Sequence, residues 1–450
     1  MPNMNDQVLG RVAGVLAAQG VRSRRVAVGL SGGVDSVVLL DLLDHLRRDF
    51  DLTLSAIHVN HGISLHAAEW ERFCGSVCAA RGIDLRVERV KVSNQGEGLE
   101  AAARRLRYQA FASVDADFVA LAHHMDDQAE TLLLQLLRGA GAKGMAAMPE
   151  LRSPSSNFGR PDTQGPAILR PLLEVSRKEI ADYAGARGLE WVEDDSNADS
   201  DLDRNYLRTQ VMPLLAARFP GYRETFSRTA RNMADQAQLA EDLAAIDLQS
   251  PDASRVPVET LRRLSAPRAL NLLRRMFTLQ GLPMPPRERL EEALRQCRDA
   301  AADAQVHVGF ESHGLRCHRG MVVLVAESQV FPGDWQTGWD GLCELQLPGG
   351  IGHLRGRRAS GEGIACRHFE IHAATVRGRS GGERIRPAPD RPLRELKKMF
   401  QELTVPPWER SRMPLVFFGD QLAWVPGIGV AEEFRAGPGE QGIVPEWKRG

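Results

Sequence analysis

One short string combines the residue types that hold a phosphate chain. Ser31-Gly-Gly-Val-Asp-Ser36 follows an apolar run and precedes a helical pattern that begins near Val37. Glycines let the backbone approach an anion, the first N–H groups of a helix point at it, and serine hydroxyls add donors. The chain has no GxxxxGK[ST] string, so this is not a Walker A loop. The Asp35 carboxylate would repel a phosphate unless a cation lies between them, which predicts Mg²⁺. The alternative is a glycine turn without a ligand.

A second group of candidate residues follows the fourth apolar run of the chain. His123, Asp127 and Glu130 are spaced so that they would share one face of a helix. Carboxylates in this arrangement could bind an amine or orient it for attack, and together with the histidine they could hold a metal. An acidic first turn that suits the helix macrodipole gives the same pattern, so these alternatives stay open.

A third group of candidate residues is basic. Arg104 and Arg107 lie on an alanine-rich helical pattern, with Leu99, Ala103 and Leu106 expected to pack against a sheet. Guanidinium groups suit a leaving pyrophosphate or RNA phosphates. A solvated helix face is the alternative.

The first third of the chain alternates strand and helix patterns that could position these groups. Apolar runs lie at 26–30, 54–59, 84–90 and 118–121, and helical patterns lie at 36–47, 65–81, 99–113 and 126–138. This alternation predicts an α/β fold with a parallel, doubly wound sheet. Ligands of such sheets bind at the carboxyl ends of the strands. Asn60 and His61 follow the second strand and could contact a ligand there, although a loop histidine with no ligand is the alternative.

The composition changes along the rest of the chain. A loop rich in proline, glycine and serine spans 152–166, and helices are expected at 176–187 and 202–218. Helical patterns continue to about residue 300 and end in a hairpin at 305–327, after which short glycine-rich strands follow. We expect a catalytic domain at 1–218, a mostly helical middle domain at 219–330 and a small α+β domain at 335–450. Phe400 and Trp408 are expected in the core of the last domain, with stacking on a nucleic-acid base as the alternative.

Composition excludes several classes of protein. The 450 residues include 57 lysines and arginines, 58 acids and 43% apolar residues, as in an ordinary globular chain. No apolar run reaches the ~18–20 residues that span a bilayer. Six scattered cysteines form neither a CxxC pair nor a disulfide framework, which predicts a reducing compartment and cytoplasmic localisation. The formal net charge is −1, so a nucleic-acid partner needs a local basic patch. Residues 377–398 provide one, with eight lysines and arginines against three acids, unless this run is only solubilising.

The string Ser31–Ser36 resembles the SGGxDS pyrophosphate loop of the N-type ATP pyrophosphatases, which cleave ATP between the α and β phosphates and adenylate a substrate oxygen. Further strings narrow the resemblance. They are His58-Val-Asn-His-Gly62, Arg104-Arg-Leu-Arg-Tyr108, Leu121-Ala-His-His-Met-Asp-Asp-Gln-Ala-Glu-Thr131, Arg170-Pro-Leu-Leu173, Asp195-Ser-Asn197 with Arg204-Asn205 and Arg208, Gly381-Gly-Glu-Arg384, Leu396-Lys-Lys-Met-Phe-Gln-Glu402 and Val405-Pro-Pro-Trp408. In this order and spacing, over the whole chain, they resemble the tRNA(Ile)-lysidine synthetase family.

The resemblance implies a ligase with a catalytic fold like that of adenine nucleotide alpha hydrolases. ATP, with Mg²⁺, would adenylate the cytidine at the first anticodon position of an isoleucine tRNA with a CAU anticodon, and diphosphate would leave. The amine of L-lysine would then displace AMP at C2 and form lysidine, which changes decoding from AUG to AUA. The alternative is a tRNA thiolation enzyme with the same loop, but such enzymes use cysteines, and none adjoins the site strings. The oligomeric state stays open, with a homodimer among the options.

The resemblance also implies roles for individual residues. The expected ATP-binding residues are Ser31, Gly32, Gly33, Val34, Asp35, Ser36, Asn60 and His61, with Asp35 also close to Mg²⁺. The expected catalytic residues are Asp35, Arg104, Arg107, Asp127 and Glu130, and lysine is expected at His123, Asp127 and Glu130. The expected tRNA-binding residues are Arg204, Arg208, Arg377, Arg379, Arg384, Arg386, Arg394, Lys397 and Lys398. The family commonly continues the string His58–Gly62 with an arginine, whereas this chain has Ile63-Ser-Leu-His66.

Overall fold

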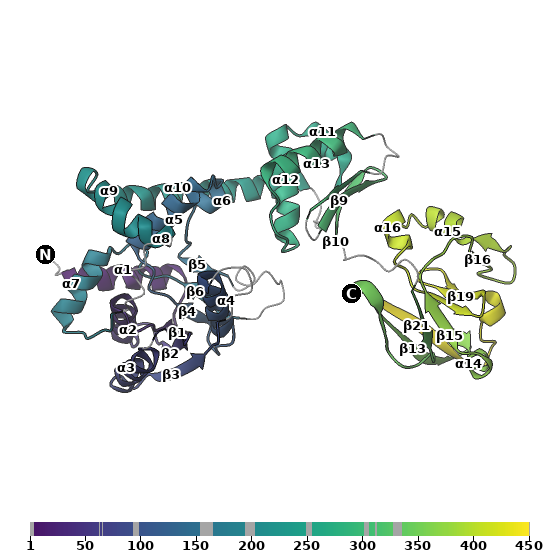
Figure 1. The fold of residues 1–450 in the computed structure, drawn as a ribbon, viewed down its shortest axis with the longest axis horizontal. Helices are drawn as coiled ribbons and strands as arrows, with labels where there is room; N and C mark the ends of the chain where they lie inside the picture. The colour runs from purple at the N-terminus through teal and green to yellow at the C-terminus, as the bar shows by residue number, and fades with distance from the viewer. Residues whose placement is uncertain are drawn as a thin grey trace. The chain divides into compact units, whose positions relative to one another are not determined.

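The chain forms two compact units (Figure 1). The computed structural model describes residues 4–62, 64, 66–92, 99–153, 165–193, 203–248, 254–300, 306–310, 313–326 and 335–449. The first unit comprises Met1–Ala253 with Ala266–Met284, and the second comprises Ser254–Ser265 with Pro285–Gly450. The chain therefore passes between the units more than once. The division into domains at 1–218, 219–330 and 335–450 stays a prediction. Most of the expected loop at 152–166 and the string Asp195–Asn197 lie outside the described residues.

A six-stranded sheet forms the centre of the first unit, with strand order β3-β2-β1-β4-β6-β5. Its strands are β1 (Arg25–Gly29), β2 (Thr53–Asn60), β3 (Asp84–Arg89), β4 (Phe118–Ala120), β5 (Leu151–Arg152) and β6 (Ala167–Leu169). All neighbouring strands are parallel except β5 and β6. The predicted parallel sheet is therefore confirmed. The direction in which the strand order grows reverses between β1 and β4, which is where open α/β sheets bind their ligands.

Helices cover both faces of this sheet. The helices of the first unit are α1 (Met4–Ala18), α2 (Val34–Leu46), α3 (Ala67–Ala79), α4 (Leu99–Ala112), α5 (Met125–Leu137), α6 (Ala142–Met145), α7 (Arg177–Arg187), α8 (Asp203–Tyr206), α9 (Met212–Arg218), α10 (Tyr222–Leu248) and α12 (Ala266–Leu279). Alternation along β1 builds the two cores, since Val26 and Val28 pack with α1, α2, α3 and α7, whereas Ala27 packs with Phe111 of α4. No helix in the described ranges is long and apolar enough to cross a membrane.

Two helices begin at places that the sequence analysis did not predict. Helix α2 begins at Val34, not near Val37, because Gly33 is still extended and acts as its N-cap. Helix α5 begins at Met125 with His124 as its N-cap. His123 therefore precedes the helix, and the prediction that it shares a helical face with Asp127 and Glu130 is wrong. Of these three residues, only Asp127 and Glu130 lie on α5.

The helix expected at 202–218 is interrupted by a wider turn. Between α8 and α9, the residues Leu207–Val211 form a π-helical turn. Such turns occur mostly as single insertions in α-helices and often lie at functional sites. Helix α10 follows, and it packs against α5 and α12 (Figure 1).

The second unit begins with a four-stranded antiparallel sheet of order β7-β10-β9-β8. Its strands are β7 (Arg255–Pro257), β8 (His307–Gly309), β9 (His313–His318) and β10 (Met321–Ala326), and its helices are α11 (Val258–Arg263) and α13 (Arg287–Asp299). The sequence analysis predicted only a hairpin at 305–327, which β9 and β10 form. It missed β7 and β8, because strands of three residues carry almost no periodic signal.

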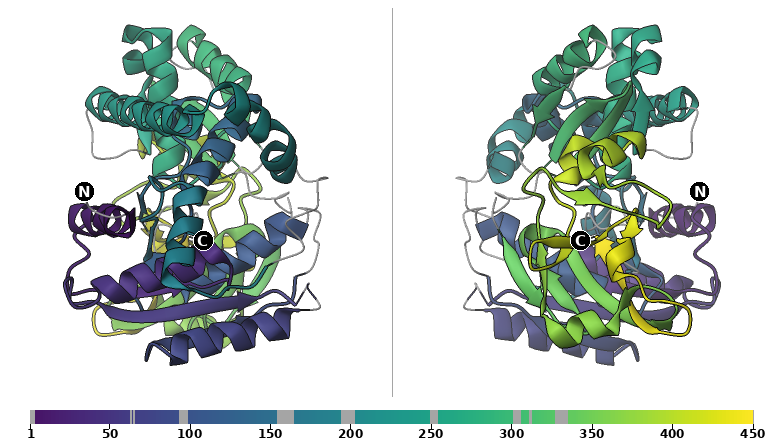
Figure 2. Two further views of the ribbon diagram at one scale, coloured as in Figure 1. Left: turned by 90° about the vertical axis from the view of Figure 1, so that its left-hand side faces the viewer. Right: turned by 90° about the vertical axis from the view of Figure 1, so that its right-hand side faces the viewer.

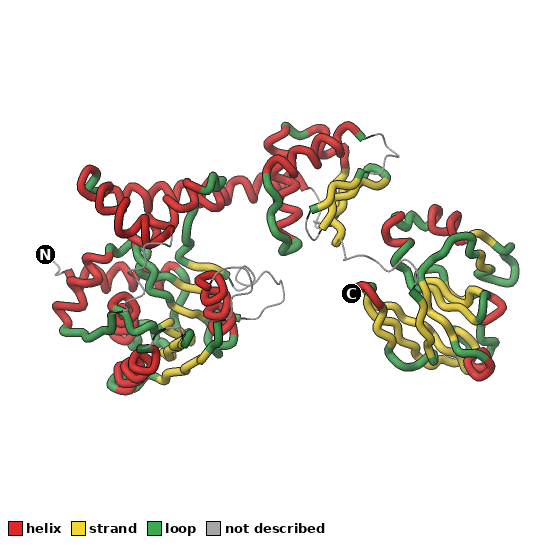
Figure 3. Tube along the Cα trace, viewed as in Figure 1, coloured by secondary structure: helices red, strands yellow, loops and turns green. Residues whose placement is uncertain are grey.

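The remaining residues of the second unit form an α+β arrangement, as predicted (Figure 3). Its sheets have the orders β11-β15-β18-β19-β20, β12-β13-β21-β14 and β16-β17. The strands are β11 (Gln336–Trp339), β12 (Leu345–Leu347), β13 (Gly352–Ser360), β14 (Ile364–Ala365), β15 (Ala374–Arg377), β16 (Arg384–Ile385), β17 (Arg394–Glu395), β18 (Leu415–Phe418), β19 (Gln421–Val425), β20 (Gly429–Val430) and β21 (Gln441–Arg449). The helices are α14 (Cys366–Ile371), α15 (Leu396–Glu402) and α16 (Pro407–Arg410). The strands face the viewer in the right-hand view of Figure 2. Phe400 is fully buried in this core, as predicted, whereas Trp408 is only half-buried.

Candidate active site

The loop after β1 is closed by its own serines. Ser36 Oγ accepts hydrogen bonds from the backbone N–H groups of Ser31 and Gly32, both at 3.2 Å, and donates to the carbonyl oxygen of Gly33 at 2.9 Å. The Ser36 hydroxyl therefore holds the loop in shape. The N–H groups of Ser36 and Val37 donate to the carbonyl oxygen of Gly33, both at 3.1 Å, which leaves those of Val34 and Asp35 to bind an anion.

Gly32 has a conformation and a setting that only glycine fits. Its φ is +93°, and a Cβ at this position would lie 2.8 Å from Val192 Cγ2. The backbone N–H of Val192 also donates to the carbonyl oxygen of Gly32 at 3.0 Å. The segment after α7 therefore packs directly against the loop and leaves no room for a side chain at position 32.

Asp35 presents a carboxylate oxygen that nothing in the described structure satisfies. Its Oδ1 is buried and has no hydrogen-bond partner among the described residues. Burial raises the pKa of Asp35, although the nearby His124, Arg177 and Arg208 act in the opposite direction. An unpaired carboxylate oxygen in the first turn of a phosphate-binding helix suits Mg²⁺, which takes one or two protein carboxylates and fills its other positions with phosphates and water.

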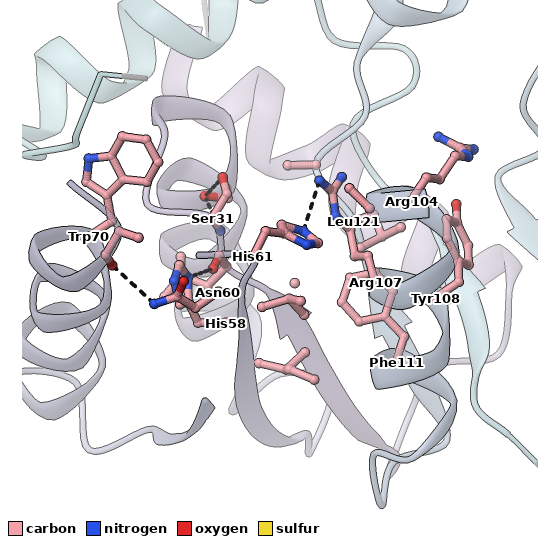
Figure 4. A pocket seen from close by; sticks show the side chains of 18 of the residues that line it. Ser31, His58, Asn60, His61, Trp70, Arg104, Arg107, Tyr108, Phe111 and Leu121 are labelled. Carbon is pink, nitrogen blue, oxygen red and sulfur yellow. Dashed lines mark hydrogen bonds between the residues drawn. The ribbon is translucent and has the colours of Figure 1, made fainter. Parts of the chain in front are cut away.

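The loop opens into a cavity of about 570 Å³ (Figure 4). Ser31 and His61 line it at the ends of β1 and β2, and Arg104 and Arg107 of α4 line one side. Trp70 of α3 lies on the opposite side (Figure 4). The sequence analysis predicted these residues apart from Trp70, which no motif distinguished. The volume is in the range of small-molecule and cofactor sites.

His61 is neutral in this cavity. Burial lowers the pKa of His61 to about 4, with further contributions from Arg107 and His58. Arg107 can only donate, so its contact with His61 Nε2 at 3.5 Å makes that nitrogen the acceptor. The hydrogen then lies on Nδ1, which is buried without a partner among the described residues. His61 therefore offers one unused donor beside the cavity.

Asn60 is engaged in holding its own loop. Its Nδ2 donates to Glu71 Oε2 at 3.1 Å, and its Oδ1 accepts from the backbone N–H of Gly62 at 2.9 Å. The side chain therefore supports the turn that presents His61. A direct contact of Asn60 with ATP stays a prediction.

Helix α4 packs with a different face from the one expected. Ala102 and Phe111 are buried against the sheet, whereas Ala103 lines the cavity and Leu106 is only half-buried. The expectation that Ala103 packs on the sheet is therefore wrong, and the packing of Leu106 on the sheet stays a prediction. The alanines of α4 lie on more than one side of the helix, so the sequence alone does not single out the face that packs on the sheet.

Burial keeps His123 neutral, and Arg170 orients its ring. Burial lowers the pKa of His123 to about 3, and Arg170 is one of the cations that lower it further. Arg170 Nε donates to His123 Nδ1 at 3.3 Å, so the hydrogen of the neutral ring lies on Nε2. A ring that only donates can bind an oxygen of a substrate but not an ammonium group.

Asp127 and Glu130 form a buried network with two arginines. Arg204 Nε donates to Glu130 Oε2 and Arg204 Nη2 to Asp127 Oδ1, both at 2.8 Å. Arg208 donates to both Glu130 oxygens, at 2.6 and 2.9 Å, and to Asp127 Oδ1 at 3.1 Å. Asp127 Oδ2 also accepts the backbone N–H of His124 at 3.1 Å and so completes the cap of α5. Asp127 therefore lies in the first turn of α5, as one of the alternatives expected, and its pairing with two arginines was not predicted.

A second cavity, of about 530 Å³, adjoins this network. Glu130, Arg208 and Arg223 line it. Asp126, also in its wall, accepts the backbone N–H of Arg177 at 2.9 Å and forms an ion pair with Arg223. The sequence analysis did not identify Arg177 or Arg223, because neither belongs to a recognisable string.

The predicted tRNA-binding residues divide between the two units. Arg204 and Arg208 lie on the buried carboxylates of the first unit, so their contact with tRNA stays a prediction. The others lie in the second unit, and several of them are paired with acids. The pairs are Arg379 with Glu383, Arg386 with Glu433, Arg394 with Glu402 and Lys398 with Glu395.

The fold and the loop define the class of the protein. A parallel sheet with a glycine–serine loop between β1 and α2 is the arrangement of the PP-loop proteins, and residues 4–215 match the family model of the PP-loop domain. Residues 257–323 match the TilS substrate binding domain, and residues 374–447 match the TilS substrate C-terminal domain.

Relatives with curated names match almost the whole chain. The tRNA(Ile)-lysidine synthase of Nitrosomonas europaea is 41% identical over 436 residues, which are 96% of this chain and 93% of the relative. The tRNA(Ile)-lysidine synthase of Azoarcus is 39% identical over 454 residues, which cover 99% of this chain and 96% of the relative. The chain belongs to the tRNA(Ile)-lysidine synthase family. A solved structure of the U34-tRNA thiolase NcsA from Methanococcus maripaludis is 21% identical, covers 52% of this chain and 79% of its own, and has a TM-score of 0.44.

Proposed function

We propose that this protein ligates L-lysine to C2 of the cytidine at the first anticodon position of an isoleucine tRNA with a CAU anticodon. ATP activates the base by adenylation, diphosphate leaves, and the lysine amine displaces AMP. The product is lysidine, so the tRNA decodes AUA in place of AUG. The reaction fits a protein of the cytoplasm, where tRNA and ATP meet.

The observation that carries this proposal is the 570 Å³ cavity at the switch point of the sheet. It joins an anion-binding loop to an unused donor on His61 and to the guanidinium groups of Arg104 and Arg107. This combination suits a nucleotide whose phosphates lie on the loop and whose base or ribose meets His61. The arginines are placed to stabilise the negative charge that develops as diphosphate leaves.

Asp35 would hold Mg²⁺ through its unpaired Oδ1. The ion supplies charge neutralisation between the carboxylate and the phosphates. His124 lies between Asp35 and Asp127, since its Nε2 is 3.8 Å from Asp35 Oδ2 and 3.5 Å from Asp127 Oδ2. This histidine therefore connects the phosphate loop with the carboxylates assigned to lysine.

Asp127 and Glu130 are the groups that best suit the amines of lysine. In the structure their oxygens are bound by Arg204 and Arg208, so an entering ammonium group would take over hydrogen bonds that a guanidinium now makes. His123 donates from Nε2 and is better suited to an oxygen, such as a phosphate oxygen or O2 of the cytidine. We therefore assign His123 to the activated base and not to lysine.

The cysteines give no support to thiolation, the other reaction that the loop allows. Burial raises the pKa of Cys74 to about 12 and that of Cys78 to about 11, so neither thiol is poised as a nucleophile. Cys297 and Cys317 are buried in the second unit. Only Cys343 is exposed, and it also lies in the second unit.

The test is a reaction of the full chain with ATP, Mg²⁺, labelled L-lysine and a transcript of isoleucine tRNA with a CAU anticodon. Mass spectrometry of the digested RNA should show a cytidine–lysine conjugate at the first anticodon position, with AMP and diphosphate released in equal amounts. Methionine tRNA, which has the same anticodon, is the matched control substrate. ATP turnover with no conjugate on either tRNA would reject lysine as the nucleophile.

A further inference from the structure

A third cavity, of about 520 Å³, lies in the second unit, far along the chain from the catalytic residues. The loop between β15 and β16 forms one side, and the turn between β18 and β19 forms the other. We propose that this cavity binds a single unpaired nucleotide of the tRNA. The inference rests on the proposed function, because it assigns a binding subsite for the same substrate.

A guanidinium group that lies over an aromatic ring lines the cavity. Arg377 and Phe417 are diagonal neighbours on the paired strands β15 and β18, since Arg377 lies opposite Leu415. The guanidinium carbon of Arg377 lies 4.0 Å from the ring centroid of Phe417, whose side chain is only 2% exposed. One face of the guanidinium is thus covered by protein. Its other face is a ready plane for a nucleobase, because unpaired RNA bases stack on arginine planes.

The arginines of this cavity differ in how far they are neutralised by acids. Arg386 faces Glu433 at 3.9 Å. Arg377 and Arg384 have no ion-pair partner in the parts of the chain that the structure describes, although both line the cavity. An unpaired guanidinium at the rim, next to a stacking plane, suits the phosphate that accompanies a base.

The loop that carries Arg384 is held in place from within. Glu383 Oε1 accepts the backbone N–H groups of Ser380 and Gly381 at 2.6 Å each, and Glu383 Oε2 pairs with Arg379 at 3.1 Å. Gly381 has a φ of +100°, which a side chain would strain. The backbone of the loop that carries Arg384 is therefore preorganised, which lowers the cost of ordering it when RNA binds.

The opposite wall offers groups that can read the edge of a base. Asp420, Gln421 and Glu433 line it, and their side-chain oxygens can accept hydrogen bonds from the amino groups of a base. A stacking plane, a phosphate contact and acceptors at the edge are the three elements of single-strand RNA recognition. A paired nucleotide could not use them, because its faces are stacked and its edge is occupied.

Arg377→Lys is the variant that tests stacking, since lysine keeps the charge and the alkyl stem over Phe417 but loses the plane. We expect tRNA affinity to fall about tenfold in Arg377→Lys, in the range that base stacking contributes, with the salt slope unchanged. Arg377→Ala should lose at least as much. Arg384→Gln should weaken binding and reduce the salt slope by about 1, as loss of one phosphate contact does. Arg358 is an exposed arginine of the same unit that does not line the cavity, so Arg358→Lys and Arg358→Ala serve as matched controls and should bind like the parent chain.

A photo-crosslink identifies the occupant directly. Benzoylphenylalanine in place of the exposed Leu393, at the cavity wall, should crosslink to one unpaired nucleotide, read by primer extension on the tRNA. Normal affinity of Arg377→Lys, or crosslinks spread over paired stem nucleotides, would overturn the proposal. The lysine-transfer assay keeps the two proposals apart. If the parent chain makes no lysidine but Arg377→Lys weakens tRNA binding, the proposed reaction is rejected and the nucleotide-binding cavity is supported. If the parent chain makes lysidine but Arg377→Lys binds tRNA normally, the nucleotide-binding cavity alone is rejected.

Discussion

Gly32→Ala should damage the phosphate loop far more than Gly33→Ala, although the two glycines are neighbours. Gly32 has a φ of +93°, and its added Cβ would lie 2.8 Å from Val192 Cγ2. Gly33 has a φ of −72°, which any residue adopts, and its Cβ would first meet Ser31 Oγ at 3.6 Å, an ordinary contact. Two adjacent positions therefore give a matched pair.

The cost of Gly32→Ala has two parts. A left-handed conformation costs an L-residue roughly 1–2 kcal/mol, and overpacking against Val192 adds about 1–3 kcal/mol. We expect the free energy of unfolding of the loop and β1 to fall by about 3 kcal/mol in Gly32→Ala, and by less than 1 kcal/mol in Gly33→Ala. Relative to Val192→Ala alone, adding Gly32→Ala should cost only about 1–2 kcal/mol, because the clash is gone and the backbone strain remains.

Hydrogen exchange of peptides from β1 and the loop measures this free energy locally, which avoids treating a chain of two units as a single unfolding transition. Equal effects of the two glycine variants would refute the reasoning. Full recovery of Gly32→Ala in the Val192→Ala background would show that steric contact alone, and not the backbone conformation, requires glycine.

Three further outcomes follow from the site. Asp35→Asn should reduce ATP-dependent lysidine formation by at least about 100-fold while tRNA binding in a filter assay stays unchanged, because it removes only the charge that a cation needs; normal turnover would remove Asp35 from the mechanism. Glu130→Gln should raise the KM for lysine about tenfold or more, as expected for a lost charged hydrogen bond, and leave the KM for ATP unchanged; a rise in both would point to a collapsed site. Joint replacement of Arg384, Arg386 and Lys397 by alanine should weaken tRNA binding and flatten its salt dependence by up to about 3 units of slope, and an unchanged slope would show that this surface does not contact phosphates.

The layers of the first unit could be predicted because their cause is local in the sequence. Alternation along β1 sends Val26 and Val28 to one face and Ala27 to the other, and glycine-rich strings mark the loop directly. Helix starts were less predictable. Two consecutive histidines precede α5, and nothing in the sequence says which of them caps the helix, so His123 was placed on a face that it does not share.

The charged network could not be predicted from spacing. Glu130 and Arg208 are 78 residues apart, and only the path of the chain through α8 and the π-helical turn brings them together. The resemblance assigned Arg204 and Arg208 to tRNA, which stays a prediction, and did not indicate their ion pairs with Asp127 and Glu130. The contact between Arg377 and Phe417 in the third cavity could not be predicted either, because it depends on the register of β15 and β18.

The path of the chain between the units sets an order for folding during synthesis. The first unit includes α12, whose Asn271 Nδ2 donates to the carbonyl oxygen of Ala240 at 2.6 Å and whose Arg275 pairs with Glu241 of α10 at 2.8 Å. A ribosome must therefore complete β7 and α11, which belong to the second unit, before the first unit has its last helix. Until then the part of α10 that packs against α12 is uncovered, and the nascent chain exposes surface that a chaperone can hold. For the same reason, a protease cut between α10 and α12 would leave the first unit in two pieces, so the two units are not interchangeable modules.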